Sequence, residues 1–192
     1  MLAAPTISGS TGLIRAPSAD VLRQGQFSGG YYFWPEANSA VFVVNAVQGL
    51  ELGLVQPYQH GTSDPISLNF KYALMPESVL LPAIAIGVED IDGRNRRSVY
   101  GVISKGLPFG FRLHLGTGTG HFDGFFFGLE KVLNPASLRS VRRGFPVTSL
   151  IVEFDGNHMN YGARFTMARG LRLDTGWQTG NGTIYLGMTF TQ

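Results

Sequence analysis

The chain has 192 residues, a net charge of +2 from 15 basic and 13 acidic side chains, and no cysteine. These values exclude disulfides, thiolate catalysis and cysteine-based metal sites, and the two short arginine clusters form no nucleic-acid-binding surface. Only 15% of the residues are charged, against about 25% in a typical soluble domain, so the composition favours a surface that does not face water.

The first 24 residues lack sustained periodicity and predict an irregular strap. Residues 25–192 predict one β-barrel domain, with the strap of residues 1–24 lying inside or against it. No run of about 18 apolar residues occurs, which excludes a transmembrane helix. Residues 1–5 are too short for a signal peptide, and this leaves open whether the chain is a mature protein, a fragment or a protein that is not exported.

Segments in which apolar and polar residues alternate follow the strap, as expected of half-buried strands. In chain order they are residues 26–34, 40–47, 50–56, 65–74, 80–89, 97–105, 109–117, 122–132, 147–155, 160–168, 171–178 and 183–190. Most have the length of about 9–11 residues with which a tilted strand crosses a bilayer. Turn sequences such as Gly180-Asn181-Gly182 predict tight antiparallel hairpins between them.

One connection predicts a single short helix. Asn134 is a suitable N-cap, Pro135 suits the first helical position and Gly144 stands where a C-terminal glycine would.

The faces of the predicted strands differ in chemistry. In residues 65–74, for example, Leu68 and Phe70 share one face, and Asn69 and Lys71 share the other, because successive strand side chains point in opposite directions. In a soluble β-sandwich the apolar face would be the core and the charged face the wet exterior. In a membrane barrel the apolar face would meet lipid and the charged face would line the lumen.

The number of apolar rows favours the barrel. Twelve strands with one apolar face each present more apolar surface than a sandwich of 192 residues readily hides. The rows contain almost no charge, as lipid contact requires, and closure satisfies the backbone amides that lipid cannot solvate. We therefore expect an all-β, antiparallel up-and-down transmembrane β-barrel of about 12 strands.

Aromatic residues toward the strand ends would in part form an interfacial girdle. They are Tyr31, Phe33, Trp34, Tyr58, Trp177 and Tyr185.

Charged residues on the opposite face predict a lumen network that pairs across neighbouring strands, because balanced charge avoids unpaired ions in a confined space. The predicted network comprises Glu51, Lys71, Glu89, Arg112, Glu130, Glu153, Arg164, Arg172 and Asp174. Pore and plug both remain open, since the strap could fill a narrow interior.

Candidate catalytic groups are few. Ser104 with His114, or with His121 and Asp123, could belong to a hydrolase, but their spacing does not ensure contact, and a place among polar lumen or loop residues is the favoured explanation. We predict no enzymatic activity, no metal site and no cofactor.

Several runs along the chain keep the order of known motifs. They are residues 11–14 (TGLI), 17–19 (PSA), 25–27 (GQF), 81–90 (LPAIAIGVED), 100–105 (YGVISK), 122–130 (FDGFFFGLE) and 152–156 (VEFDG). This ordered set resembles the YjbH-like family of bacterial outer-membrane proteins linked to exopolysaccharide production. The resemblance implies an outer-membrane barrel with a structural or transport-accessory role. It also implies membrane lipid and lipopolysaccharide as surroundings, polysaccharide or export proteins as partners, no nucleic acid and no catalytic residue.

Two other functions remain as alternatives. A soluble β-sandwich that binds carbohydrate would use Trp34 and Trp177 for stacking, and an outer-membrane lipid hydrolase would depend on Ser104 or His114.

Overall fold

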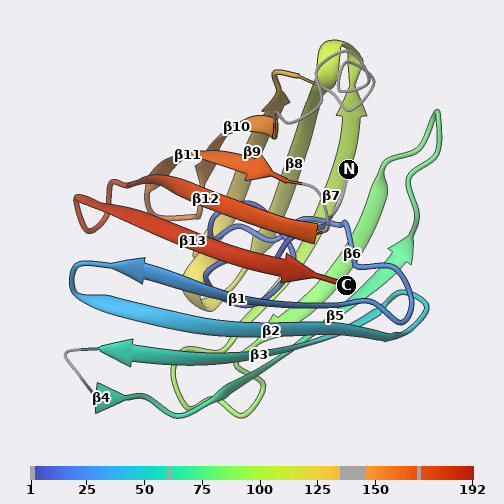
Figure 1. The fold of residues 1–192 in the computed structure, drawn as a ribbon. Helices are drawn as coiled ribbons and strands as arrows, with labels where there is room; N and C mark the ends of the chain where they lie inside the picture. The colour runs from blue at the N-terminus through green and yellow to red at the C-terminus, as the bar shows by residue number, and fades with distance from the viewer. Residues whose placement is uncertain (1–2, 60–61, 135–145, 168–169) are drawn as a thin grey trace.

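Antiparallel strands that follow one another along the chain pair into a closed β-barrel (Figure 1). The computed structural model describes residues 3–59, 62–134, 146–167 and 170–192. Its strands are β1 (Phe27–Trp34), β2 (Ala37–Val47), β3 (Leu50–Gln59), β4 (Thr62–Ser63), β5 (Ser67–Met75), β6 (Ala83–Glu89), β7 (Ser98–Leu107), β8 (Phe111–Gly118), β9 (Gly124–Val132), β10 (Val147–Phe154), β11 (Met159–Thr166), β12 (Leu171–Gln178) and β13 (Thr183–Thr191). Two 3₁₀ turns, η1 (Pro108–Gly110) and η2 (Gly120–Phe122), lie in hairpins. None of the helices in the described ranges is long and apolar enough to cross a membrane.

The barrel closes because its first and last strands pair. β1 pairs with β13 from Ser28↔Thr191 to Phe33↔Leu186, and β2 joins β1 to β3. The two-residue β4 pairs only with the end of β3, so twelve of the described strands form the wall. The predicted strand number and up-and-down order are confirmed. The helix predicted after Asn134 lies outside the described residues.

The even number of wall strands places the start of β1 and the end of β13 at one end of the barrel. There Phe27 and Gln192 exchange two backbone hydrogen bonds of 3.0 Å. The hairpins after β1, β3, β6, β8, β10 and β12 form the opposite end, which we call the distal mouth. The predicted Gly180-Asn181-Gly182 turn is one of them, and Gly182 has a φ of +62° that favours glycine.

The outer surface of the wall is apolar and the inner surface is polar. On β13, Leu186 and Met188 are 57% and 55% exposed, whereas Thr189 is 1% exposed. This is the reverse of a soluble sandwich, whose apolar faces are hidden from solvent. A closed barrel with an apolar exterior excludes the soluble alternative and fits a bilayer.

Part of the aromatic set near the strand ends faces outward, as expected from the sequence. Tyr31, Phe33, Tyr58 and Trp177 are exposed, as the girdle requires. Tyr185 is 2% exposed, and Trp34 packs against a buried cluster inside the barrel. The reason is strand alternation: Tyr185 shares the face of Thr189, and Trp34 shares the face of the buried Tyr32.

Candidate functional site: a plugged lumen with a polar mouth

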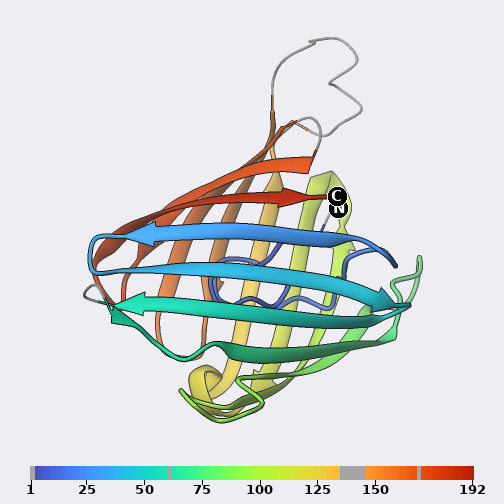
Figure 2. The same ribbon diagram turned by 60° about the horizontal axis from the view of Figure 1, so that its bottom comes forward.

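Residues 3–24, the strap, pass through the interior of the barrel (Figure 2). The strap folds back on itself through backbone bridges between Pro5 and Thr11 and between Gly12 and Pro17. Strap and wall share a buried apolar cluster made of Ile7, Leu13, Ile14, Tyr32, Val41, Val55, Ile151 and Tyr185. The strap therefore fills the lumen as a packed plug.

Glycines on the inner wall make room for the strap. A Cβ at Gly128 on β9 would collide with the side chain of Leu13, and a Cβ at Gly53 on β3 would collide with the backbone oxygen of Gly9. These strand glycines mark a close approach of another segment, which is a common reason for glycine within a strand.

Glu51 and Lys71 form a buried ion pair that also holds the strap. They face each other in the β3–β5 register, with 3.4 Å between Lys71 Nζ and Glu51 Oε1. Lys71 donates to the backbone oxygens of Thr11 at 2.9 Å and Asp20 at 2.7 Å. Glu51 accepts from the backbone N–H of Thr11 at 3.0 Å. Both charges thus have the additional hydrogen bonds that a buried pair needs.

Glu153 on β10 binds the strap through consecutive backbone amides. Its carboxylate accepts from the N–H groups of Ile14, Arg15 and Ala16 at 2.9, 2.8 and 3.2 Å, and from Asn160 Nδ2 at 3.0 Å. Successive N–H groups that converge in this way form an anion-binding concavity, which is occupied here by a side chain of the wall.

Arg164 and Asp174 pair across β11 and β12. They are partners in the register of these strands, and Arg164 Nε and Asp174 Oδ1 are 2.6 Å apart. The guanidinium also donates to the backbone oxygens of Gly12 at 3.2 Å and Leu13 at 2.8 Å. This pair, like that of Glu51 and Lys71, joins two strands and the strap.

Arg112 links the strap to the turn between β5 and β6. It donates to both carboxylate oxygens of Asp20 at 2.9 and 2.6 Å and to Glu77 at 2.6 Å. Glu130 is its register partner on β9, but Arg112 turns to these two acids instead. Partial burial raises the pKa of Glu77, but the Gly106 N–H and Arg112 outweigh this and hold it below its usual value.

All nine charged residues predicted for the lumen lie on the inner face and are at most 8% exposed. Glu89 accepts from Ser8 Oγ at 3.2 Å, and Arg172 donates to the backbone oxygen of Ala3 at 2.6 Å. Many partners of these charges are thus strap groups. The sequence pattern could not predict these partners, because nearly every residue carries the same backbone N–H and C=O groups whatever its type.

The predicted hydrolase residues lie in two separate places. Ser104 Oγ and His114 Nδ1 are 2.7 Å apart on the inner wall, and Ser104 Oγ also accepts from the N–H of Ala19 at 2.8 Å. Both are 1% exposed. His121 and Asp123 lie instead in the hairpin between β8 and β9 at the distal mouth. Within the described ranges, no three His, Asp or Glu side chains are grouped to hold a metal ion.

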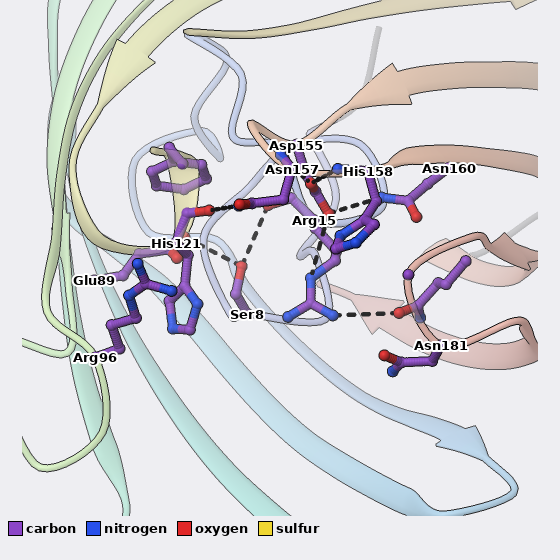
Figure 3. Close-up of a pocket in the computed structure, with 13 residues that line it drawn as sticks. Ser8, Arg15, Glu89, Arg96, His121, Asp155, Asn157, His158, Asn160 and Asn181 are labelled. Atoms are coloured by element: carbon purple, nitrogen blue, oxygen red, sulfur yellow. Dashed lines mark hydrogen bonds and ion pairs between the residues drawn. The ribbon is translucent and has the colours of Figure 1, made fainter. Parts of the chain in front are cut away.

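A polar cavity of about 300 Å³ opens at the distal mouth (Figure 3). Side chains from the strap, from the hairpins and from the adjoining strand ends line it, among them Arg15, Arg96, His121, Asp155, Asn160 and Gln178. A second cavity of about 210 Å³ adjoins it, shares Arg15, Arg96 and His121, and extends to Trp34. The sequence did not predict this site, because its residues come from separate hairpins and from the aperiodic strap.

Comparison with known proteins agrees with this architecture. The family model described as exopolysaccharide biosynthesis protein YbjH matches residues 6–136. No curated protein sequence matches the chain. Among solved structures, the KdgM porin is similar with a TM-score of 0.58 at 6% identity, over 86% of this chain and 97% of that chain.

Two further solved structures are more distant. An outer membrane channel from Pseudomonas putida F1 has a TM-score of 0.46 at 10% identity, over 91% of this chain and 97% of that chain. A mutant porin of Rhodopseudomonas blastica has a TM-score of 0.38 at 14% identity, over 82% of this chain and 56% of that chain.

Proposed function

This chain belongs to the family of exopolysaccharide biosynthesis proteins described by the YjbH model, and we propose that it serves polysaccharide production or export as a non-catalytic, plugged barrel. The predicted outer-membrane location agrees with its lipid-facing surface and with its porin-like fold. Membrane lipid and lipopolysaccharide are then its surroundings, and polysaccharide or export proteins are its partners.

The main support for this proposal is the strap that fills the lumen. An open pore would leave the charges of its wall to water. Here Lys71, Glu153 and Arg164, from three different strands, all bind backbone groups of the strap. A lumen filled in this way does not suit free diffusion of solutes. It suits an accessory protein in which passage through the barrel is controlled.

The surroundings of the serine and histidine pair support a non-catalytic role. A nucleophile needs a base and an open approach for its substrate. Ser104 already accepts a hydrogen bond from Ala19, and the pair is buried beneath the strap on the lumen side, away from lipid. Its contact with the strap gives it a structural role in holding the plug.

Polysaccharide output in cells tests the proposal. Cells that lack this chain should release less exopolysaccharide than cells that contain it. The Ser104→Ala variant should restore most of the output, because a non-catalytic barrel does not need that hydroxyl as a nucleophile and the strap loses only one of its hydrogen bonds to the wall. The measurement is cell-associated and secreted polysaccharide, with barrel assembly checked by heat-modifiable migration on a detergent gel. Unchanged output without the chain would contradict the family role, and a Ser104→Ala variant that assembles but restores nothing would favour the hydrolase.

A further inference from the structure

Arg96 is a free cation at the distal mouth. It lies in the hairpin between β6 and β7, is exposed, and lines both cavities. Its guanidinium has no hydrogen bond or ion pair with any residue in the described parts of the chain. Arg15 lies across the same cavity on the strap and donates to Gln178 Oε1 at 3.2 Å.

The two acidic residues that line the larger cavity, Glu89 and Asp155, both accept hydrogen bonds. Asp155 Oδ1 accepts from the N–H groups of Asn157 at 3.0 Å and His158 at 2.8 Å, and its Oδ2 accepts from Asn160 at 3.0 Å. Glu89 accepts from Ser8. Four hydrogen bonds compensate these carboxylates, and Arg15 Nε lies 3.9 Å from Asp155 Oδ2. The guanidinium of Arg96 faces solvent and is open to a ligand.

The pKa of His121 is shifted by burial and by the charges that surround the cavity. Burial lowers its pKa, and the charges of Arg15 and Arg96 lower it further, each more strongly than Asp90 or Asp155 raises it. An anion bound beside His121 would raise this pKa again.

Gln178 supplies a second group without a partner. It is 2% exposed and lines the larger cavity, and its Nε2 donates to no atom of the residues that the structure describes. A buried amide that lacks a hydrogen bond is costly, so an acceptor atom of a ligand would be favoured here. In the adjoining cavity Trp34 offers an aromatic surface.

We propose that these joined cavities bind a segment of an acidic polysaccharide. A uronate carboxylate binds the guanidinium of Arg96, a ring or hydroxyl oxygen accepts from Gln178 Nε2, and one face of a sugar packs on Trp34. Arginine suits this role because its planar guanidinium matches a carboxylate with two parallel hydrogen bonds. The assignment rests on the proposed function and names its substrate class.

Binding of soluble oligosaccharides to the full chain in detergent tests the assignment. An alginate-derived tetrasaccharide should bind, and neutral maltotetraose should bind at least about tenfold more weakly, since a hydrogen bond to a charged group accounts for a difference of this size. The Arg96→Ala variant should lose about tenfold in affinity for the acidic probe. Arg94→Ala is the matched control, because Arg94 lies in the same hairpin, pairs with Asp92 and lines neither cavity.

Gln178→Glu gives an independent variant. It keeps an acceptor for Arg15 but removes the free N–H donor and adds a negative charge, so it should also weaken binding of the acidic tetrasaccharide by about tenfold. NMR titration of the His121 ring should show its pKa rising when the acidic probe binds, an effect that merely structural damage would not produce.

Carboxylated sugars occur both in secreted polysaccharides and in lipopolysaccharide, so lipopolysaccharide is added in a separate arm. Binding of the tetrasaccharide that depends on Arg96 supports the proposal. Equal binding of maltotetraose, binding of lipopolysaccharide alone, or full affinity in Arg96→Ala would overturn it. Because this assay uses purified protein, its failure would leave the cellular result on polysaccharide output untouched.

Discussion

The carboxylate of Glu153 shows how a single residue fixes the plug. It is fully buried, yet its four hydrogen bonds include three from consecutive strap amides. Hydrogen bonds to a charged acceptor are stronger than neutral ones, and burial away from water increases the penalty for losing them. Glu153 therefore contributes more to the position of the strap than an apolar contact of similar size.

Replacing Glu153 with Gln should loosen the strap. The new side-chain amide presents N–H groups to the N–H donors of Ile14 and Ala16, and we expect the variant to lose about 2–3 kcal/mol of local stability. Hydrogen exchange in detergent micelles measures this as faster exchange at these two amides. Glu36→Gln, in the exposed turn between β1 and β2, is the control and should leave exchange unchanged. Equal protection in both variants would show that the carboxylate is not needed.

For a single residue, the sequence predicts the strand face on which its side chain lies but not the hydrogen-bond partners of that side chain. The alternation around Lys71 and Arg164 places both residues on the polar face, and their pairs with Glu51 and Asp174 follow the strand register. The bonds of Glu153 to the strap could not be predicted, because nothing in residues 14–16 distinguishes their amides from any others. The inward position of Tyr185 does not follow from its residue type, since an aromatic residue near a strand end is compatible with either face.

The strap and the wall are complementary elements. The wall supplies small residues where the strap passes, and the strap supplies Leu13 and Ile14 to the apolar cluster. The strands could be located from the sequence because a period of two persists through each of them. The path of the strap could not, because an aperiodic segment carries no signal of the surface that it contacts.

A larger side chain at Gly128 should displace the strap and open the lumen. Gly128→Val places methyl groups where Leu13 now lies, while the backbone pairing of β9 with its neighbours can persist. We expect the parent protein to give no stable current in a planar lipid bilayer and the variant to give discrete channel steps. Gly101→Ala on β7 is the control, because a Cβ at Gly101 meets no atom within 4 Å, and it should behave as the parent. Steps of the same size in the parent and in Gly128→Val would show that the strap does not block passage.

The whole molecule has its polar and apolar surfaces in reversed positions relative to a soluble protein. Buried charges and strap hydrogen bonds occupy the interior, whereas Leu, Ile and Phe side chains cover the exterior. Such a chain is stable only where hydrocarbon contacts the outer wall, because in water a continuous apolar belt would be exposed to solvent. The low charged fraction of the sequence already indicated this arrangement.

A charge on the outer wall should therefore destabilise the barrel as a whole. Leu186 lies near the middle of β13 and is 57% exposed, so Leu186→Arg places a guanidinium against the hydrocarbon core. We expect the free energy of unfolding to fall by about 2–4 kcal/mol, the cost of arginine near the bilayer midplane. Urea titration in phosphatidylcholine vesicles measures this loss. Gln192→Arg, at the end of the chain beyond β13, is the control and should change it little, because arginine costs about 0–1 kcal/mol near the interface. If both variants unfolded at the same urea concentration as the parent, the outer wall would not be in contact with lipid.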